Sequence, residues 1–368
     1  MRRLVVVVPE LLSLDEPVLD RGLPSISLLA ERSILYRLAQ LEPVETPEAR
    51  LLGLRPSEAE LRQGPLTISA LGADPPPRSL HFHLSLASLY EDVIRQPEPG
   101  PGEEEVRTIV EVATKLNTRL LTLVAGSGVD HGLVWEALGD LETDPISSVV
   151  GCPIHEHLPR GDGEPMLRQY IDDSVNLLGE LDLNRRRIDE GQMPLNLLWP
   201  WGHGERGPIP NLALRRGGPA TVISSSLRLA GLTRLAGYRH LDVAWLGSGL
   251  QTRLREAAAR LLDESNAVLV LHSLETFRAA GELDEAAYFA RQLDSELLAP
   301  VLAQAADEPV RLLFAAPSSN HDGLAVQFDS KSPGDSIYPF DERSIDEERL
   351  PRIDLESVIA ATLTVETE

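Results

Sequence analysis

The last third of the chain alternates short apolar runs with amphipathic segments. Residues 220–224, 267–271 and 310–315 are apolar runs with the length of buried strands. Between them, residues 252–262 and 283–302 repeat apolar side chains at helical spacing. Strands separated by helices of this length pair in parallel and carry helices on both faces of the sheet. We therefore expect an α/β fold with a mostly parallel sheet.

The N-terminal sequence, MRRLVVVVPE, fits the same fold. Residues 4–8 are mostly β-branched without alternation, which is typical of a central parallel strand that is buried on both faces. Pro9 and Glu10 end this run far below the length of a signal-peptide core or a membrane span. Cys152 is the only cysteine, so neither an intrachain disulfide nor a cysteine metal cluster can form. These features predict a soluble, cytoplasmic protein.

A glycine-rich stretch, residues 195–210 with the sequence LNLLWPWGHGERGPIP, lies in the middle of the chain. Its apolar start predicts a buried strand. Its glycines predict a loop at the C-terminal end of that strand, where open α/β sheets bind ligands. His203, Glu205 and Arg206 in this loop are candidate ligand-binding residues. The alternative interpretation is a strand followed by a simple turn, with both tryptophans in the core.

The chain is strongly acidic, with a net charge of −23 at pH 7 and a pI near 4.8. Such a surface repels nucleic acid and anionic membranes, so neither is an expected partner. A small anionic ligand in a locally basic pocket, or a protein partner, is compatible with this charge. The acidic tail, residues 336–356, is expected on the surface. The sequence predicts no oligomeric state.

The length of the chain, 368 residues, favours one large domain with an insertion, or two domains. Residues 96–105, QPEPGPGEEE, have the composition of a linker and predict a boundary. A long amphipathic helix is expected over residues 166–187. We interpret residues 97–184 as a smaller inserted α+β cap domain, and residues 1–96 with 185–368 as a discontinuous core domain.

Three segments match the motifs of a known enzyme family. Residues 199–210 resemble an aromatic or basic residue followed by G-x-G-x-x-P-x-(I/L)-P, residues 50–56 resemble (I/L)-L-G-Y-D-P, and Gln63-Gly64-Pro65 stands where the family has R-G-P. The family is that of the archaeal-type cofactor-independent phosphoglycerate mutases, within the alkaline phosphatase superfamily. The resemblance extends over residues 4–338 and implies an alkaline phosphatase-like core.

The resemblance also implies a site with two divalent metals, Asp and His ligands, and a serine nucleophile that carries phosphate. In this chain the implied positions hold other residues. The expected strand-end aspartate is replaced by Pro9 and the nucleophile by Val44. The other ligand positions fall on Phe277, Gly281 and the segments 317–320 and 329–334.

Residues beside these positions remain candidates for the chemistry. Thr46, two residues from the nucleophile position, is a candidate catalytic residue. His83 stands where the family has a strand arginine, and a histidine there would bind an anion weakly. A cap arginine of the family maps near His131. The candidates for displaced metal ligands are Glu10, His272, Glu275, His321 and Asp322.

Three hypotheses follow for the function. The first is a catalytically degenerate relative that acts as a binding or structural protein and needs no cofactor. The second is an active phosphoglycerate mutase or phosphomonoesterase with relocated ligands for Mn, Zn or Mg, so the sequence leaves open whether the chain is an enzyme. The third is an interaction module whose acidic residues 341–348 dock on a basic partner. Convergence of His272, Glu275, His321 and Asp322 on Glu10 would favour the second hypothesis, and their dispersal or pairing in salt bridges would favour the first.

Overall fold

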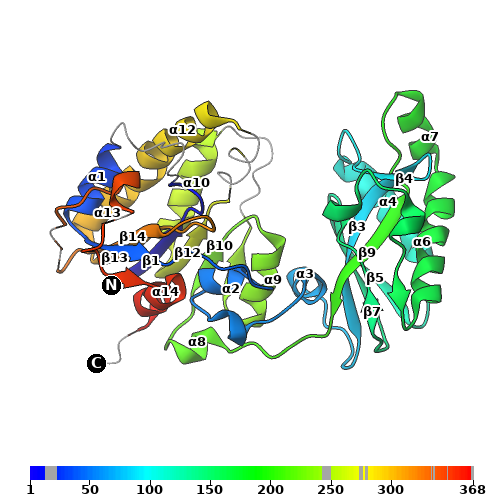
Figure 1. The fold of residues 1–368 in the computed structure, drawn as a ribbon, viewed down its shortest axis with the longest axis horizontal. Helices are drawn as coiled ribbons and strands as arrows, with labels where there is room; N and C mark the ends of the chain where they lie inside the picture. The colour runs from blue at the N-terminus through cyan, green and yellow to red at the C-terminus, as the bar shows by residue number, and fades with distance from the viewer. Residues whose placement is uncertain are drawn as a thin grey trace. The chain divides into compact units, whose positions relative to one another are not determined.

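A computed structural model shows two compact units (Figure 1). It describes residues 1–12, 23–242, 250–272, 277, 281–332, 334, 336–345 and 347–365. Unit 1 comprises Met1–Ala59 and Ile209–Glu368, and unit 2 comprises Glu60–Pro208. Among the described residues, no helix is long and apolar enough to cross a membrane.

Unit 1 is built on an eight-stranded sheet. Its strands, in spatial order, are β11 (Arg239–Leu241), β10 (Thr221–Ile223), β12 (Asn266–Val270), β1 (Arg2–Val7), β13 (Val310–Ala316), β14 (Gly323–Asp329), β2 (Ile34–Leu38) and β15 (Arg352–Ile353). The first five strands in this order run parallel to one another, and β14 is antiparallel to both of its neighbours. The sheet is therefore mixed but mostly parallel, which confirms the predicted fold class.

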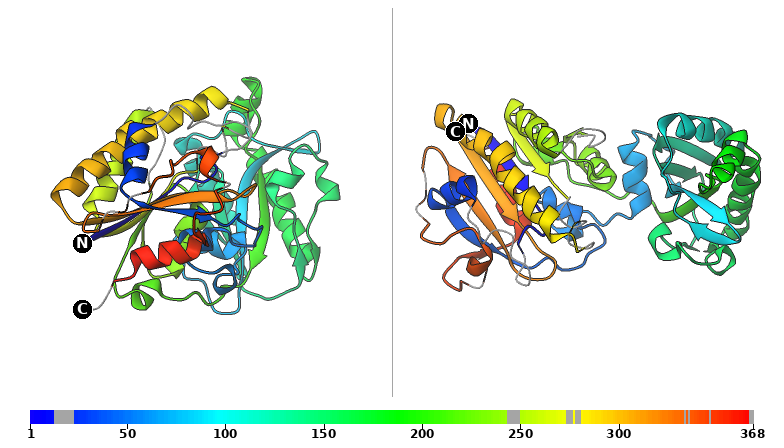
Figure 2. Two further views of the ribbon diagram at one scale, coloured as in Figure 1. Left: turned by 60° about the vertical axis from the view of Figure 1, so that its left-hand side comes forward. Right: turned by 90° about the horizontal axis from the view of Figure 1, so that it is seen from above.

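Helices cover both faces of this sheet (Figures 1 and 2). Leu4 and Val6 of β1 face one apolar core, which they share with side chains from α1, α10, α12 and α13. On the other face, α14 packs against β1 and β13. The helices among the described residues of unit 1 are α1 (Pro24–Glu31), α2 (Glu48–Leu51), α8 (Leu212–Arg215), α9 (Leu227–Leu235), α10 (Leu250–Asp263), α12 (Leu283–Gln292), α13 (Ala299–Asp307) and α14 (Leu355–Leu363), with short 3₁₀ turns at Pro56–Glu58 and Glu342–Ser344.

The helix expected over residues 283–302 contains a π-helical segment, Leu293–Leu298, between α12 and α13. This segment carries Asp294, whose buried carboxylate accepts hydrogen bonds from the backbone N–H groups of Ser25 and Ile26 at 3.1 and 2.8 Å. Asp294 therefore caps α1 from a distant helix, because α1 has no side-chain cap of its own. Single-turn π segments of this kind often serve a specific contact.

The acidic tail departs from its expected surface position. Phe340, Ile345 and Leu350 are buried in the same core as β1, and α14 follows them. The three side chains are spaced five residues apart, which matches neither the period of a strand nor that of a helix. Residues 336–356 therefore show no apolar pattern in the sequence, although they contribute to the core.

Unit 2 is built around β3 (Leu80–Tyr90). This strand pairs antiparallel with β9 (Leu197–Gly204) on one edge and with β6 (Asp130–Trp135) on the other, and β6 pairs with β5 (Leu121–Ser127). The short β4 (Val93–Arg95) extends the sheet, and β7 (Leu141–Glu142) forms a separate ladder with β8 (Arg160–Gly161).

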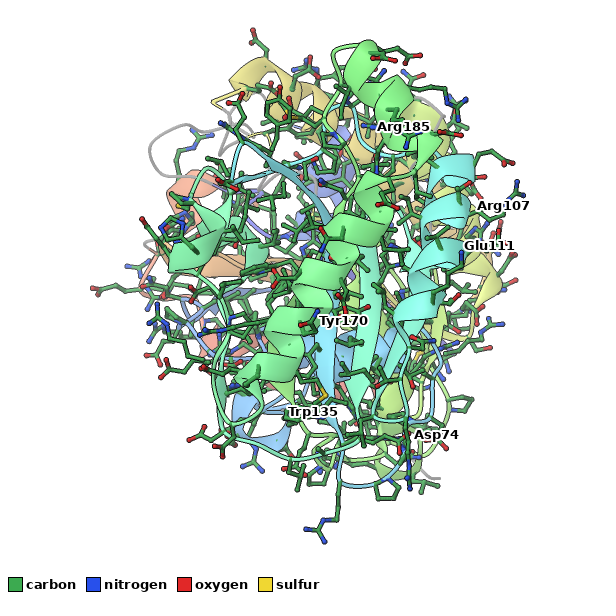
Figure 3. All side chains as sticks on the ribbon, turned by 90° about the vertical axis from the view of Figure 1, so that its right-hand side faces the viewer. Asp74, Arg107, Glu111, Trp135, Tyr170 and Arg185 are labelled. Atoms are coloured by element: carbon green, nitrogen blue, oxygen red, sulfur yellow. The ribbon has the colours of Figure 1, made fainter. Side chains whose placement is uncertain are left out.

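Helices lie on both faces of the unit 2 sheet. One face packs on α4 (Glu103–Ala113) and α6 (Glu164–Gly179), and the other packs on α3 (Gln63–Ala70). Figure 3 shows Arg107 and Glu111 of α4 pointing outward, and Tyr170 of α6 is buried in the core. The remaining helices of unit 2 are α5 (Ile146–Val149), α7 (Asp182–Asp189) and 3₁₀ turns at Thr114–Leu116 and Ile154–Glu156.

The boundaries of the inserted unit differ from the expected residues 97–184. The structure also places residues 60–96 and 185–208 in it, because β3 pairs with both β6 and β9. The proline-rich stretch 96–105 joins β4 to α4 inside unit 2 and is not a domain boundary. β9, which was expected in the α/β sheet, therefore belongs to the antiparallel sheet of the smaller unit.

Two further features of unit 2 have a glycine nearby. The helix expected over residues 166–187 is divided into α6 and α7 just after Gly179. Gly64 in α3 lies directly on β3, where an added Cβ would overlap the backbone of His81 and Phe82. Only a residue without a Cβ allows α3 this close to the sheet.

Candidate functional site

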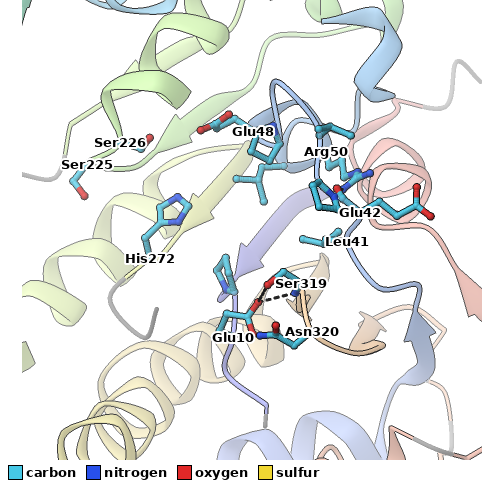
Figure 4. A pocket seen from close by; sticks show the side chains of 15 residues that line it. Glu10, Leu41, Glu42, Glu48, Arg50, Ser225, Ser226, His272, Ser319 and Asn320 are labelled. Carbon is cyan, nitrogen blue, oxygen red and sulfur yellow. Dashed lines mark hydrogen bonds between the residues drawn. The ribbon is translucent and has the colours of Figure 1, made fainter. Parts of the chain in front are cut away.

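A large cavity of unit 1 lies at the carboxyl ends of β1, β12 and β13. Its volume is about 940 Å³ (Figure 4). Val7 is in register with Val270 on one side and Ala315 on the other, so the residues after the three strands meet at one edge of the sheet. Ligand sites of open α/β sheets lie at this edge. The cavity is thus where the resemblance predicted the catalytic centre.

Glu10 lines this cavity just beyond β1. Its backbone has φ of 55°, which is uncommon for a residue with a side chain. The Glu10 carboxylate accepts hydrogen bonds from the Ser318 hydroxyl at 2.9 Å and from the Ser319 N–H and hydroxyl at 2.7 and 3.0 Å. Glu10 therefore joins the ends of β1 and β13, and the dashed lines in Figure 4 mark its hydrogen bonds with Ser319.

The loop before α2 forms a second wall of the cavity. Val44, which the resemblance places at the position of the nucleophile, lines the cavity. Thr46 is 1% exposed and is not among the lining residues. Arg50 donates to the Glu42 carbonyl oxygen at 2.8 Å, and Glu48 forms an ion pair with Arg228 at 2.7 Å.

The third wall comes from β12 and from the start of α9. His272 lines the cavity just beyond the end of β12 at Val270, opposite Ser225 and Ser226. Ser226 is the N-cap of α9, and its hydroxyl oxygen accepts a hydrogen bond from the Leu229 N–H at 3.2 Å. This wall therefore offers an imidazole and hydroxyl groups to a ligand.

His321 and Asp322, two further displaced-ligand candidates, are not among the residues that line the cavity. Asp322 pairs with Arg352 at 2.8 Å and with Arg37 at 3.3 Å, and it accepts the Gln40 N–H at 3.0 Å. The hydrogen bonds and charge of Arg352 hold the pKa of this carboxyl below its usual value. His321 bonds the carbonyl oxygen of Asp322 through Nδ1 at 2.7 Å. Asp322 thus fastens β2, β14 and β15 together. Glu275 lies outside the described residues.

The donor set of this cavity does not fit a pair of divalent metals. Of the proposed ligands within the described part of the chain, only Glu10 and His272 line it, and Ser318 and Ser319 already occupy three acceptor positions of the Glu10 carboxylate. Over the described ranges, no group of three or more His, Cys, Asp or Glu side chains could hold a metal ion. A single zinc site normally needs three or four such ligands.

In unit 2, His83 lies buried between β3 and α3. Its Nδ1 contacts the Thr67 hydroxyl at 2.8 Å, and its Nε2 lies 3.2 Å from an Asp130 carboxylate oxygen. The Trp201 ring packs on it with a centroid distance of 4.9 Å. The expected anion-binding histidine is thus engaged in packing and hydrogen bonds within unit 2. His203 is also buried, and its Nδ1 contacts the Thr143 hydroxyl at 3.1 Å.

Glu205 and Arg206 line a separate cavity of unit 2 together with His81. Burial, with the nearby Arg206 charge, lowers the pKa of His81 to about 4. Burial likewise lowers the pKa of His131 to about 4. The His131 Nδ1 accepts a hydrogen bond from the Gly126 N–H at 3.0 Å. Protonation of Nδ1 would place its N–H against the Gly126 N–H, and two donors repel each other. Sequence reasoning did not single out His81, because its burial depends on pairing between β3 and β9.

Comparisons with known proteins agree with the geometry. No protein-family model matches the chain. The chain is 26% identical over 317 residues to the 2,3-bisphosphoglycerate-independent phosphoglycerate mutase of Methanosarcina barkeri, covering 80% of this chain and 79% of that protein.

Two solved structures share the fold along their whole length. The PH0037 protein of Pyrococcus horikoshii has a TM-score of 0.73 at 16% identity, with 100% of this chain and 99% of that chain covered. The cofactor-independent phosphoglycerate mutase of Thermoplasma acidophilum has a TM-score of 0.65 at 18% identity, with 98% and 99% covered. The chain therefore has the fold of these two structures, a mixed and mostly parallel α/β sheet with a second, smaller unit, as the sequence predicted.

Proposed function

We propose that this chain, a relative of the archaeal-type 2,3-bisphosphoglycerate-independent phosphoglycerate mutases, is catalytically degenerate and uses its strand-end cavity to bind a small molecule. The observation that carries the proposal is the side-chain set at the ends of β1, β12 and β13. Valine stands where the resemblance places the nucleophile, and of the ligand candidates that the structure describes, Glu10 and His272 line the cavity. A valine side chain cannot attack phosphorus, and two ligands cannot hold a metal pair.

The cavity retains features of a small-molecule site. Leu41, Val44 and Leu51 give it an apolar wall, and Arg50, Ser226 and Asn320 add polar groups. A volume of about 940 Å³ and a mostly apolar lining with a few polar groups are common properties of ligand pockets. Arg50 would contact an anionic group of the ligand. We expect this binding to take place in the cytoplasm and without a nucleic-acid or membrane partner.

The competing function is an active metal-dependent mutase or phosphomonoesterase with relocated ligands. One observation favours it: Glu10 and His272 do line the same cavity. Against this function, the Asp322 carboxylate forms ion pairs with Arg352 of β15 and Arg37 of β2. Thr46, the alternative nucleophile, is buried away from the cavity wall.

Metal binding by the purified protein separates the two functions. Melting is followed with Mn²⁺, Zn²⁺ and Mg²⁺, and conversion of 3-phosphoglycerate to 2-phosphoglycerate is assayed with each metal. The degenerate protein shows neither a metal-dependent shift in Tm nor turnover. A ligand at about one hundred times its dissociation constant stabilises the folded state by roughly 2.7 kcal/mol. A shift of that size with metal-dependent turnover would reject our proposal.

Binding is then measured with 3-phosphoglycerate in the absence of metal, as a probe of the cavity. We expect saturable binding by calorimetry that Val44→Trp abolishes, because the indole fills the cavity. Val150→Trp is the matched control, since Val150 is exposed on unit 2. If 3-phosphoglycerate does not bind, or binds equally to Val44→Trp, the cavity is not a site for this class of ligand.

A further inference from the structure

Arg50 is a buried cation on the wall of the strand-end cavity of unit 1. The residue is 8% exposed, and it lines the cavity together with Leu41 and Glu42 (Figure 4). Arginine is rarely buried to this extent unless a carboxylate pairs with it. Among the described residues, however, Arg50 has no ion pair, because Glu48 of the same helix pairs with Arg228 at 2.7 Å. The counter-ion of Arg50 therefore has to come from outside the described part of the chain.

The hydrogen bonds of Arg50 leave one edge of its guanidinium group open. Nη1 donates to the Glu42 carbonyl oxygen at 2.8 Å. Nε and Nη2 make no hydrogen bond with a described residue, yet neither nitrogen is enclosed, so a ligand can reach both. These two nitrogens form one side of the planar group, from which two parallel N–H bonds can reach a carboxylate or a phosphate. The open edge therefore indicates an anionic group in the cavity.

The other charges of the cavity distinguish between these two anions. Arg50 is the only arginine or lysine among the described residues that line it, whereas Glu10, Glu42 and Glu48 all line it. The ion pair with Arg228 balances Glu48, and the other two carboxylates make the wall negative. A phosphate monoester carries a charge of about −1.5 to −2 at pH 7, which exceeds the charge of one guanidinium group. A carboxylate carries a single negative charge and is repelled less by this wall.

The rest of the wall is largely apolar, and the cavity is larger than a carboxylate group needs. Its volume is about 940 Å³. An apolar body attached to the carboxylate would be removed from water here, and this burial would add affinity. The apolar lining residues are Pro9, Leu41, Pro43, Val44, Pro47 and Leu51.

We propose that the strand-end cavity binds a monocarboxylate with an apolar body, whose carboxylate accepts hydrogen bonds from Nε and Nη2 of Arg50. This inference rests on the proposed function, a small-molecule cavity without catalysis, and adds the class of ligand. The recognised group is the carboxylate and not a phosphate. 3-Phosphoglycerate then binds through its carboxylate, and its phosphate group weakens the complex.

The test is isothermal titration calorimetry of the full chain without metal, with phenylacetate as the probe. Two matched compounds keep the phenyl ring. Phenyl phosphate replaces the carboxylate with a phosphate, and phenylacetamide replaces it with an uncharged amide of the same shape. We expect phenylacetate to bind at least tenfold more tightly than either compound, and more tightly than 3-phosphoglycerate.

Variants of Arg50 locate the carboxylate. Arg50→Gln removes the positive charge and should weaken phenylacetate binding at least tenfold. Its Tm shows whether the variant is folded, and the comparison with phenylacetamide tests the same contact in the unaltered protein. The matched control is Arg260→Gln on α10. Arg260 forms an ion pair with Glu256 and does not line the cavity, so this variant should bind phenylacetate as the wild-type protein does.

Glu42→Gln tests the charge of the wall. It removes one carboxylate and keeps the backbone oxygen that accepts from Arg50. Because the repulsion grows with the charge of the ligand, the affinity for phenyl phosphate should rise at least threefold and the affinity for phenylacetate should rise less. An equal rise for both compounds would show that the wall does not select against phosphate.

The remaining outcomes separate this inference from the proposed function. If 3-phosphoglycerate or phenyl phosphate binds as tightly as phenylacetate or more tightly, the cavity binds small molecules but the carboxylate inference is wrong. Equal binding of phenylacetamide, or unchanged affinity in a folded Arg50→Gln variant, would also overturn it. If neither phenylacetate nor 3-phosphoglycerate binds, both the inference and the proposed binding function fail.

Discussion

The strand-end cavity of unit 1 and the α3-covered face of unit 2 differ in the surroundings of the residues at the expected functional positions. In unit 1, the loops after β1, β12 and β13 surround an open cavity, although Val44 stands at the nucleophile position. In unit 2, His83 stands at the position of an expected ligand-binding arginine and is closed in by α3, Thr67 and Asp130. Residues in loops at strand ends can be substituted while the cavity between the loops remains. A helix packed directly on a sheet leaves no such room, so its polar residues become part of the packing.

The largest expected effect is acid destabilisation of unit 2. His81 and His131 have folded pKa values of about 4, whereas an unfolded histidine has a pKa near 6.5. Below pH 6.5 these histidines bind protons in the unfolded state, whereas in the folded state they stay neutral down to about pH 4. The free energy of unfolding therefore falls as the pH falls from 6.5 towards 4. From pH 7 to pH 5 the loss should be about 2 kcal/mol per histidine, or about 4 kcal/mol for the pair.

Urea unfolding followed by tryptophan fluorescence measures this loss. Three of the four tryptophans, Trp135, Trp199 and Trp201, belong to unit 2. His131→Gln should reduce the pH dependence by about half, and His155→Gln should not change it. A fluorescence transition with the same midpoint at pH 7 and pH 5 would contradict the prediction.

A smaller loss is expected for Gly64→Ala. The added methyl group would overlap the β3 backbone at His81, so α3 must move away from the sheet. We expect a loss of about 3 kcal/mol in the free energy of unfolding, seen in the same urea experiment. The matched control is Gly179→Ala, also in a helix of unit 2, where an added Cβ meets nothing within 4 Å. Equal stability of the two variants would show that α3 does not pack closely on β3.

In unit 1, Glu10→Gln tests whether the cavity edge depends on the carboxylate. The substitution removes the charge that strengthens hydrogen bonds from Ser318 and Ser319. We expect a loss of about 1–2 kcal/mol, measured by urea unfolding with circular dichroism. Glu42→Gln changes another carboxylate of the same cavity and should have less effect. A loss for Glu42→Gln as large as that for Glu10→Gln would reject this role for Glu10.

The smallest effect is expected from restoring a hydroxyl at the nucleophile position. Val44→Ser supplies the nucleophile, yet it does not supply the missing ligands that would hold a metal pair. We therefore expect no gain in 3-phosphoglycerate turnover with Mn²⁺ present. Turnover well above that of the wild-type protein would mean that this cavity does assemble a metal site.

Much of the α/β core could be predicted because its strands carry continuous apolar runs. Residues 4–8 and 310–315 correspond to β1 and β13, and their cavity follows from parallel register. β9 was assigned to the wrong sheet, since its apolar start looks the same in a parallel and an antiparallel sheet. The histidine network of unit 2 was not predictable, because it depends on pairing between β3, β6 and β9.

The sequence predicted the location of the candidate cavity better than it predicted which side chains line it. The resemblance placed Val44 and Glu10 at one cavity, and both line it. It could not show that Asp322 turns to Arg37 and Arg352, because those partners lie on β2 and β15, far away in the sequence. Local sequence describes which groups are present near a strand end. Long-range pairing decides where they point.

The insertion of unit 2 also sets the order in which the ribosome can complete the two units. Leu4 must wait for Ala267 and Leu312, its partners in β12 and β13, which are synthesised more than 250 residues later. Unit 2 is continuous in sequence, so all of its strands are available well before β12. Domains generally fold as they emerge, and pairings between distant residues form slowly. During synthesis the apolar β1 therefore stays unpaired, while the inserted unit between the two halves of its own sheet is already able to fold.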